Sequence, residues 1–90
     1  MKVDDKEEIV KKCTEMLEEM MGDITVPRNI WRSTSEVKNK LLNGDEPLAV
    51  RVATVISDLD ELTTTPNIPS HTRALVWSIV SQLETIAVDE

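Results

Sequence analysis

The fold is decided by residues 63–77, which read T-T-T-P-N-I-P-S-H-T-R-A-L-V-W. Pro69 suits the first turn of a helix, where its fixed φ and missing N–H do no harm. Apolar residues occupy nearly every position after Arg73, which predicts a helix buried on more than one side. The run is shorter than the roughly 20 apolar residues of a membrane span. We therefore expect the central helix of a soluble bundle, and no membrane association.

The spacing of apolar residues predicts three further helices before this one. The first runs from about Asp4 or Asp5 to Met21, because its apolar residues recur at intervals of three and four. Gly22 is expected to end this helix in the left-handed conformation.

The second helix is expected to run from Pro27 to about Asn43, with Gly44 as its stop. Asp23 or Thr25 is a candidate for its N-terminal cap. Its buried face is predicted to contain Ile30, Trp31, Thr34, Val37, Leu41 and Leu42.

The third helix is expected to begin after Asp45, a good capping residue, and to end near Leu62 or Thr63. Threonine and proline are poor helix-interior residues, which sets this boundary. The fourth helix then runs from Pro69 to about Ala87, with Asn67 as a candidate cap and residues 88–90 as a frayed tail.

A shift of 42 residues superimposes the two halves of the chain: Leu17 meets Leu59, Pro27 meets Pro69, and Leu41 meets Leu83. Each half therefore reads as a helical hairpin. The short connections favour antiparallel neighbours, so we predict an all-α four-helix up-and-down bundle built from two similar hairpins. Two HEAT-like helical repeats are the alternative, although stacked repeats usually need three or more units.

The length and composition of the chain limit the classes of protein to which it can belong. Ninety residues suit one domain, which we place at residues 1–90, and the chain contains no Tyr or Phe. One cysteine, Cys13, excludes an internal disulfide, and no apolar segment follows Met1. Both features favour a cytoplasmic protein. The net charge of −7 describes an acidic protein and argues against general nucleic-acid binding, but residues 24–44 alone are basic, with four bases and one acid.

Three motifs carry a family resemblance: V-P-R-N-I in the second helix, L-D-E-L at the end of the third, and P-N-I-P-S-H-T-R before Trp77. With these motifs the chain resembles the archaeal uncharacterised protein family 0147, from Ile9 to Ile86. The resemblance implies a small all-α four-helix bundle in an archaeal cytoplasm. It implies no activity, and it supplies no catalytic residues to transfer.

The residues themselves give no signature of catalysis, so we predict a protein that is not an enzyme and has no cofactor. A structural zinc site needs four ligands, and only Cys13 and His71 are of the usual types. No phosphate-binding glycine motif occurs. Ser70 next to His71 suggests a hydrolase, with Asp58 or Asp60 orienting the ring, but adjacent helical residues point in different directions. We expect hydrogen bonding at the helix start instead, and we expect Cys13 to be a packing thiol.

The bundle topology predicts a polar cluster where the first and third helices end and the second and fourth begin. A structural network of arginine–carboxylate pairs is one interpretation, and an anion or RNA-phosphate site at two helix N-termini is the other. The cluster is expected to contain Arg28, Asn29, Arg32, Asp58, Asp60, Asn67, His71 and Arg73.

The function that we predict is contact with another protein, as an adaptor, a small subunit or a homo-oligomer. Met16, Met20 and Met21 form the candidate interface, because methionine-rich stripes make adaptable apolar surfaces. The alternative is a nucleic-acid-associated accessory protein, for RNA or the ribosome, that uses the basic second helix. Both tryptophans, Trp31 and Trp77, are expected to pack in the core.

Overall fold

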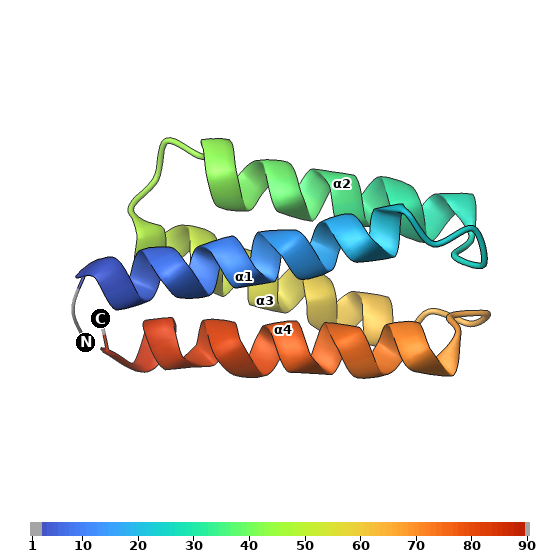
Figure 1. Ribbon diagram of the computed structural model, residues 1–90. Helices are drawn as coiled ribbons and strands as arrows, with labels where there is room; N and C mark the ends of the chain where they lie inside the picture. Colours follow the sequence, from blue (N-terminus) through green and yellow to red (C-terminus); the bar gives the residue numbers. More distant parts are fainter. Residues whose placement is uncertain (1–2, 90) are drawn as a thin grey trace.

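The computed structural model describes residues 3–89, which form four α-helices (Figure 1). The predicted C-terminal ends of the first three helices are confirmed, and α4 extends two residues beyond the predicted Ala87. Glu90, the last residue of the expected frayed tail, lies outside the described residues. The helices are α1 (Val3–Met21), α2 (Arg28–Asn43), α3 (Leu48–Thr63) and α4 (Ser70–Asp89).

The helices form a closed ring of antiparallel neighbours. α1 packs against α2, α2 against α3, α3 against α4, and α4 against α1 (Figure 1). Stacked HEAT-like hairpins would pack α1 on α3 and α2 on α4, and no such contacts occur within the described chain. The all-α four-helix up-and-down bundle is therefore confirmed.

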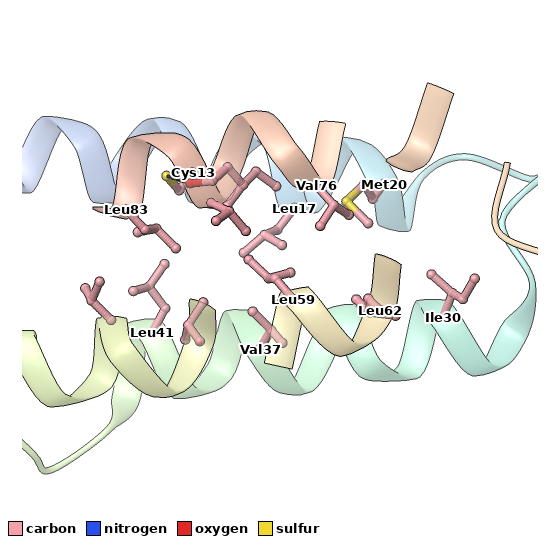
Figure 2. Close-up of a cluster of buried hydrophobic side chains, with 14 of the residues drawn as sticks. Cys13, Leu17, Met20, Ile30, Val37, Leu41, Leu59, Leu62, Val76 and Leu83 are labelled. Carbon is pink, nitrogen blue, oxygen red and sulfur yellow. Dashed lines mark hydrogen bonds between the residues drawn. The ribbon is translucent and has the colours of Figure 1, made fainter. Parts of the chain in front are cut away.

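Every helix contributes to one apolar core. Leu17, Leu41, Leu59 and Leu83 are fully buried, and residues from the four helices point toward one another across the centre (Figure 2). Ile68, in the loop before α4, covers one end of this core at 7% exposure. The apolar stripes that the sequence shows at helical spacing are therefore the surfaces that hold the bundle together.

Three apolar residues predicted to be buried are exposed: Trp31 at 43%, Leu42 at 44% and Trp77 at 51%. Trp31 and Leu42 directly follow core residues of α2. Successive residues of a helix are rotated by about 100° around its axis, so each lies outside the narrow core stripe. α4 repeats this arrangement, with Trp77 next to the buried Val76.

α4 is not the central helix that the sequence suggests. It packs against α1 and α3 only, as many neighbours as every other helix has. Its outer side exposes Ala74, Trp77 and Ser78. The continuous apolar run of α4 thus includes residues of both its buried face and its exposed face.

The expected helix caps are wrong in detail. Proline occupies the N-cap of both α2 and α3, and neither helix has a side-chain cap, so Asp45 does not cap α3. Asn67 adopts a left-handed φ of 74° and turns the chain before α4. Gly22 does not have a positive φ, and the turn at Met21 closes through backbone bonds such as Gly22 N–H to Glu18 O.

Gly44 is required by a close approach rather than by a positive φ. A Cβ atom at this position would lie 2.6 Å from Arg51 Cδ and 2.9 Å from Lys40 O. The Arg51 side chain crosses from α3 and donates to Leu41 O at 2.6 Å and to Glu46 O at 2.9 Å. It thereby bonds a carbonyl in the last turn of α2 and fixes the connection between the two hairpins.

Candidate functional site

Two loops, residues 22–27 and 64–69, lie at the same end of the bundle (Figure 1), which we call the two-loop end. The first turns of α2 and α4 start there, and they carry most of the predicted polar cluster: Arg28, Asn29, Arg32, His71 and Arg73, with Asn67 in the second loop. All six side chains are exposed. The structure therefore gathers these polar groups at one end of the surface.

A hydrogen bond between Asp23 and His71 joins the first loop to α4. His71 Nε2 and Asp23 Oδ2 lie 2.7 Å apart, although the residues are separated by 48 positions in the sequence. Thr25 donates to Asp23 Oδ1 through its hydroxyl, at 2.6 Å, and through its backbone N–H, at 2.9 Å. The hydrolase alternative, which the sequence did not favour, placed Asp58 or Asp60 beside His71, whereas the structure places Asp23 there.

These donors hold the pKa of Asp23 at about 2, below its ordinary 3.8. The largest cause is the side-chain hydrogen bond from Thr25, followed by the Thr25 backbone N–H and then by His71. Both carboxylate oxygens are thus engaged by groups of the chain itself. The Thr25 hydroxyl also lies 3.4 Å from His71 Nε2, but it donates its proton to Asp23 Oδ1. This arrangement supports a structural link between the hairpins, because the hydroxyl near the ring is itself held by the same carboxylate.

The predicted arginine–carboxylate network does not form among the described side chains, residues 6–86. The ion pairs that join neighbouring helices use lysines instead: Lys38 Nζ to Glu18 Oε1 at 3.5 Å, and Lys40 Nζ to Asp58 Oδ2 at 2.8 Å. The hydrogen bond with Asp58 raises the pKa of Lys40. Asp58 therefore belongs to the contact between α2 and α3, and the partners of His71 are Asp23 and Thr25.

The arginines remain free of such pairs. Among the described side chains, Arg28, Arg32 and Arg73 have no ion pair or hydrogen bond. Asp60 is exposed and likewise outside these pairs. The two-loop end thus presents arginines whose guanidinium groups are available to a partner.

A groove of about 420 Å³ lies between the end of α1 and the start of α4. Thr72 lines it at 1% exposure, and its hydroxyl has no hydrogen-bond partner within the described chain. Thr14 and Thr34, in contrast, each donate to the carbonyl four residues earlier. Thr72 lacks that option because Ile68, four residues earlier, precedes the helix. Its buried hydroxyl is a local cost to stability.

Cys13 is a packing thiol, not a nucleophile. It is fully buried, with Sγ at 3.9 Å from Ile79 O in α4. Burial raises the pKa of the thiol to about 11. The thiolate form that attacks substrates or binds metals is thus disfavoured.

The three methionines of the predicted interface occupy different environments. Met20 belongs to the core at 2% exposure, so it cannot contact a partner in this state. Met16 and Met21 are half-buried, and Met16 Sδ accepts a hydrogen bond from Gln82 at 3.5 Å. An interface role for Met16 and Met21 stays a prediction.

The most exposed large apolar residue, Ile24, was missed by the sequence interpretation. Its side chain is 99% exposed in the loop that leads into α2. Trp31 follows in the first turns of α2, and Arg28 and Arg32 flank it at three residues before and one after. We call this set, Ile24, Arg28, Trp31 and Arg32, the Trp31 corner.

A second exposed aromatic surface lies on α4 and differs in character. Trp77 is 51% exposed among small exposed side chains. Charged residues occur only at the two ends of the surface, Arg73 and Glu84. We call it the Trp77 face, and it comprises Arg73, Ala74, Trp77, Ser78, Ser81 and Glu84.

The part of the chain that the structure describes contains no group of three or more His, Cys, Asp or Glu side chains arranged to hold a metal ion. Across residues 3–89, none of the four helices combines the length and apolarity needed to cross a membrane.

Comparison with known proteins agrees with the fold. A protein from Methanosarcina mazei named UPF0147 protein is 47% identical over 90 residues, covering 100% of this chain and 97% of its own. The crystal structure of a UPF0147 protein from Thermoplasma acidophilum superimposes with a TM-score of 0.86 at 37% identity, covering 93% of this chain and 99% of that one.

A second crystal structure, of the unknown-function protein MMP1188, gives a TM-score of 0.81 at 48% identity and covers 86% of this chain and 88% of that one. The relatives that carry the family name come from archaea. The sequence profile of the "Uncharacterised protein family (UPF0147)" matches residues 1–86. The chain therefore belongs to this family, UPF0147.

Proposed function

We propose that this protein is a non-enzymatic interaction module that binds another protein through the Trp31 corner. The observation that carries the proposal is the exposure of Ile24 at 99%, in the loop before α2, and of Trp31 at 43%, near the start of α2. Tryptophan and arginine are the residues that most often dominate the binding energy of protein interfaces.

The local structure supports a preformed docking surface. Trp31 N–H donates to Pro27 O at 3.0 Å, which places the tryptophan in an ordered first turn of α2. The loop beside it is held by the hydrogen bond between Asp23 and His71. A surface that is already ordered loses less conformational entropy when it binds.

The charges of the corner indicate the chemistry of the partner. Arg28 and Arg32 have no carboxylate partner among residues 6–86, although the whole chain carries a net charge of −7. Guanidinium groups form two-bond pairs with carboxylates. The corner therefore fits an apolar segment that also carries Asp or Glu.

Affinity capture with three immobilised baits tests this proposal: the wild type, Trp31→Ala, and Trp77→Ala as the matched control. The archaeal lysate is treated with nuclease, so that only protein contacts remain. We expect a protein that the wild type and Trp77→Ala retain and that Trp31→Ala and Ile24→Asp lose. If Trp31→Ala retains the same proteins as the wild type, the corner is not the interface.

A nucleic-acid-associated role is the second candidate, because the exposed Trp31 lies between two unpaired arginines. An aromatic ring beside arginines can stack on the bases of single-stranded RNA. Lys38 and Lys40 support this role less well, since each already pairs with a carboxylate. Retention that disappears after nuclease treatment would favour this candidate, and binding of an RNA oligonucleotide should then weaken steeply with salt.

A further inference from the structure

The exposed residues of α4 repeat along one face of the helix. Arg73, Trp77, Ser81 and Glu84 are separated by four, four and three residues, which keeps them on one side of a helix with 3.6 residues per turn. The stretch from Ala74 to Leu83 contains no charged residue. The face is therefore a neutral surface with a cation at one end and an anion at the other.

The two charges at the ends are available. Arg73 and Glu84 are both exposed, and neither takes part in an ion pair among the described side chains. They lie 11 residues apart, or about 16 Å along the axis at 1.5 Å per residue. Within one chain they are too far apart to pair with each other.

We propose that the Trp77 face binds the same face of a second copy, with the two α4 helices antiparallel around a two-fold axis. An axis next to residues 78 and 79 brings Arg73 of each copy to Glu84 of the other. The same axis brings Trp77 of each copy close to Ser81 of the other, because the midpoints of the two pairs differ by only about half a residue along the helix. In a two-fold contact each such pair occurs twice.

Shape supports this register. Ala74, Ser78 and Ser81 are small exposed side chains near Trp77, so two such helices can approach closely and leave room for the indole ring of each copy. A large aromatic side chain buries considerable apolar area in such a contact. Because the middle of the face is neutral, two copies meet there without charge repulsion, although each carries a net charge of −7.

The neighbouring helix extends the neutral surface. α3 packs against α4, and its first three turns expose the uncharged Val50, Ala53, Thr54 and Ser57, whereas its last turn exposes the acids Asp60 and Glu61. α1 contrasts with it, since Glu7, Glu8, Lys11, Lys12, Glu15, Glu18 and Glu19 are all exposed. The contact is short, so we place it among small, reversible interfaces, below roughly 1,200 Å² in total.

This inference goes beyond the proposed function, because it uses the other tryptophan and a different helix. Sedimentation velocity of the full chain from about 10 μM to 1 mM, the range of weak association, tests it. We expect a monomer–dimer equilibrium for the wild type. A protein that is monomeric throughout this range would overturn the proposal.

Charge reversal tests the register. Arg73→Glu places two acids together at each end of the contact, and Glu84→Arg places two bases together, so each variant alone should weaken the dimer by roughly tenfold. The double variant R73E/E84R restores both pairs and should restore the dimer. Failure of the double variant to recover dimerisation would overturn the antiparallel arrangement.

Two tryptophan variants complete the experiment. Trp77→Ala should weaken the dimer, and Trp31→Ala should leave it unchanged, with circular dichroism used to verify that each variant is folded. If Trp31→Ala abolishes dimerisation and Trp77→Ala does not, the self-association uses the Trp31 corner and the proposal is wrong. The affinity capture above reports separately on the proposed function, since it depends on Trp31.

Discussion

The two hairpins, α1–α2 and α3–α4, share one core pattern and present different surfaces. Leu17 and Leu59 occupy equivalent positions in α1 and α3, and both are fully buried. Pro27 and Pro69 each precede the second helix of a hairpin. The equivalence of the buried leucines and of the prolines that precede the second helices explains why the two hairpins resemble each other in the bundle.

The exposed positions do not follow the repeat. Trp31 of the first hairpin corresponds to Arg73 of the second, and Ile30 corresponds to Thr72. The first hairpin therefore carries its tryptophan beside arginines, and the second carries Trp77 on a neutral face. The comparison teaches that packing constrains the core of both hairpins alike, while their surfaces are free to take separate roles.

The largest effect is expected where the hairpins are equivalent. Leu17→Ala and Leu59→Ala each remove a fully buried side chain, so each should lower the free energy of unfolding by about 2–5 kcal/mol. Urea unfolding followed by circular dichroism measures both. Leu42→Ala, at an exposed position, is the control and should change stability little. If only one of the two substitutions lowers the free energy of unfolding, the two hairpins are not equivalent in the core.

The core could be predicted from the sequence because helical periodicity determines which residues share a face of a helix. Leu17, Leu41, Leu59 and Leu83 all fall on such stripes, and all are buried. Trp31 was misplaced because periodicity does not set the width of a buried stripe, and it directly follows the core residue Ile30. The width of the buried stripe depends on how closely the neighbouring helices approach, and that distance is set only in the assembled bundle.

The contacts of the candidate site could be predicted from the sequence only in part. The bundle topology correctly brought His71, Arg28 and Arg73 to one end, since antiparallel helices return to the same end. It did not identify the contact of His71 with Asp23, because 48 residues separate the two and several acids were available nearby. Nothing in the local sequence signals the exposure of Ile24, which follows from the path of one loop.

The position where Ile30 corresponds to Thr72 allows the comparison to be sharpened. Thr72→Val removes a buried hydroxyl that has no partner and keeps the volume of the side chain, so we expect stability to rise by about 1 kcal/mol. Thermal and urea unfolding measure the change.

Thr34→Val is the matched control, because the Thr34 hydroxyl donates to Ile30 O at 2.8 Å. Loss of this hydrogen bond should reduce the free energy of unfolding by about 0.5–1.5 kcal/mol. Opposite signs at the two threonines would support the cost assigned to the unpaired hydroxyl. A loss of stability in Thr72→Val would mean that this hydroxyl is satisfied in solution.

The smallest effect is expected at the link between the hairpins. The pKa of Asp23 is about 2 in the folded protein and 3.8 when unperturbed, so its ionised form stabilises the fold above pH 3.8. This contribution is lost as the pH falls from 3.8 to about 2. Asp23→Asn should therefore unfold at a lower temperature than the wild type near neutral pH, with the difference shrinking in that acid range.

Thermal unfolding at several pH values between 2 and 7 measures this dependence. Asp60→Asn, at an exposed carboxylate outside the link, is the control and should show a smaller difference from the wild type. An equal dependence in both variants would show that Asp23 contributes no more than an ordinary surface acid.

The closure of the ring between α1 and α4 has a consequence for synthesis of the protein. Cys13 of α1 meets Ile79 of α4, which lies 66 residues later in the chain. The ribosome adds about 5–20 residues per second, so the segment from Met21 to Ser70 takes roughly 2–10 s to make. During that interval the apolar stripe of α1 has only its neighbour α2 to cover it. The nascent chain therefore completes its core only when its last helix emerges, and until then chaperones and other chains can reach that stripe.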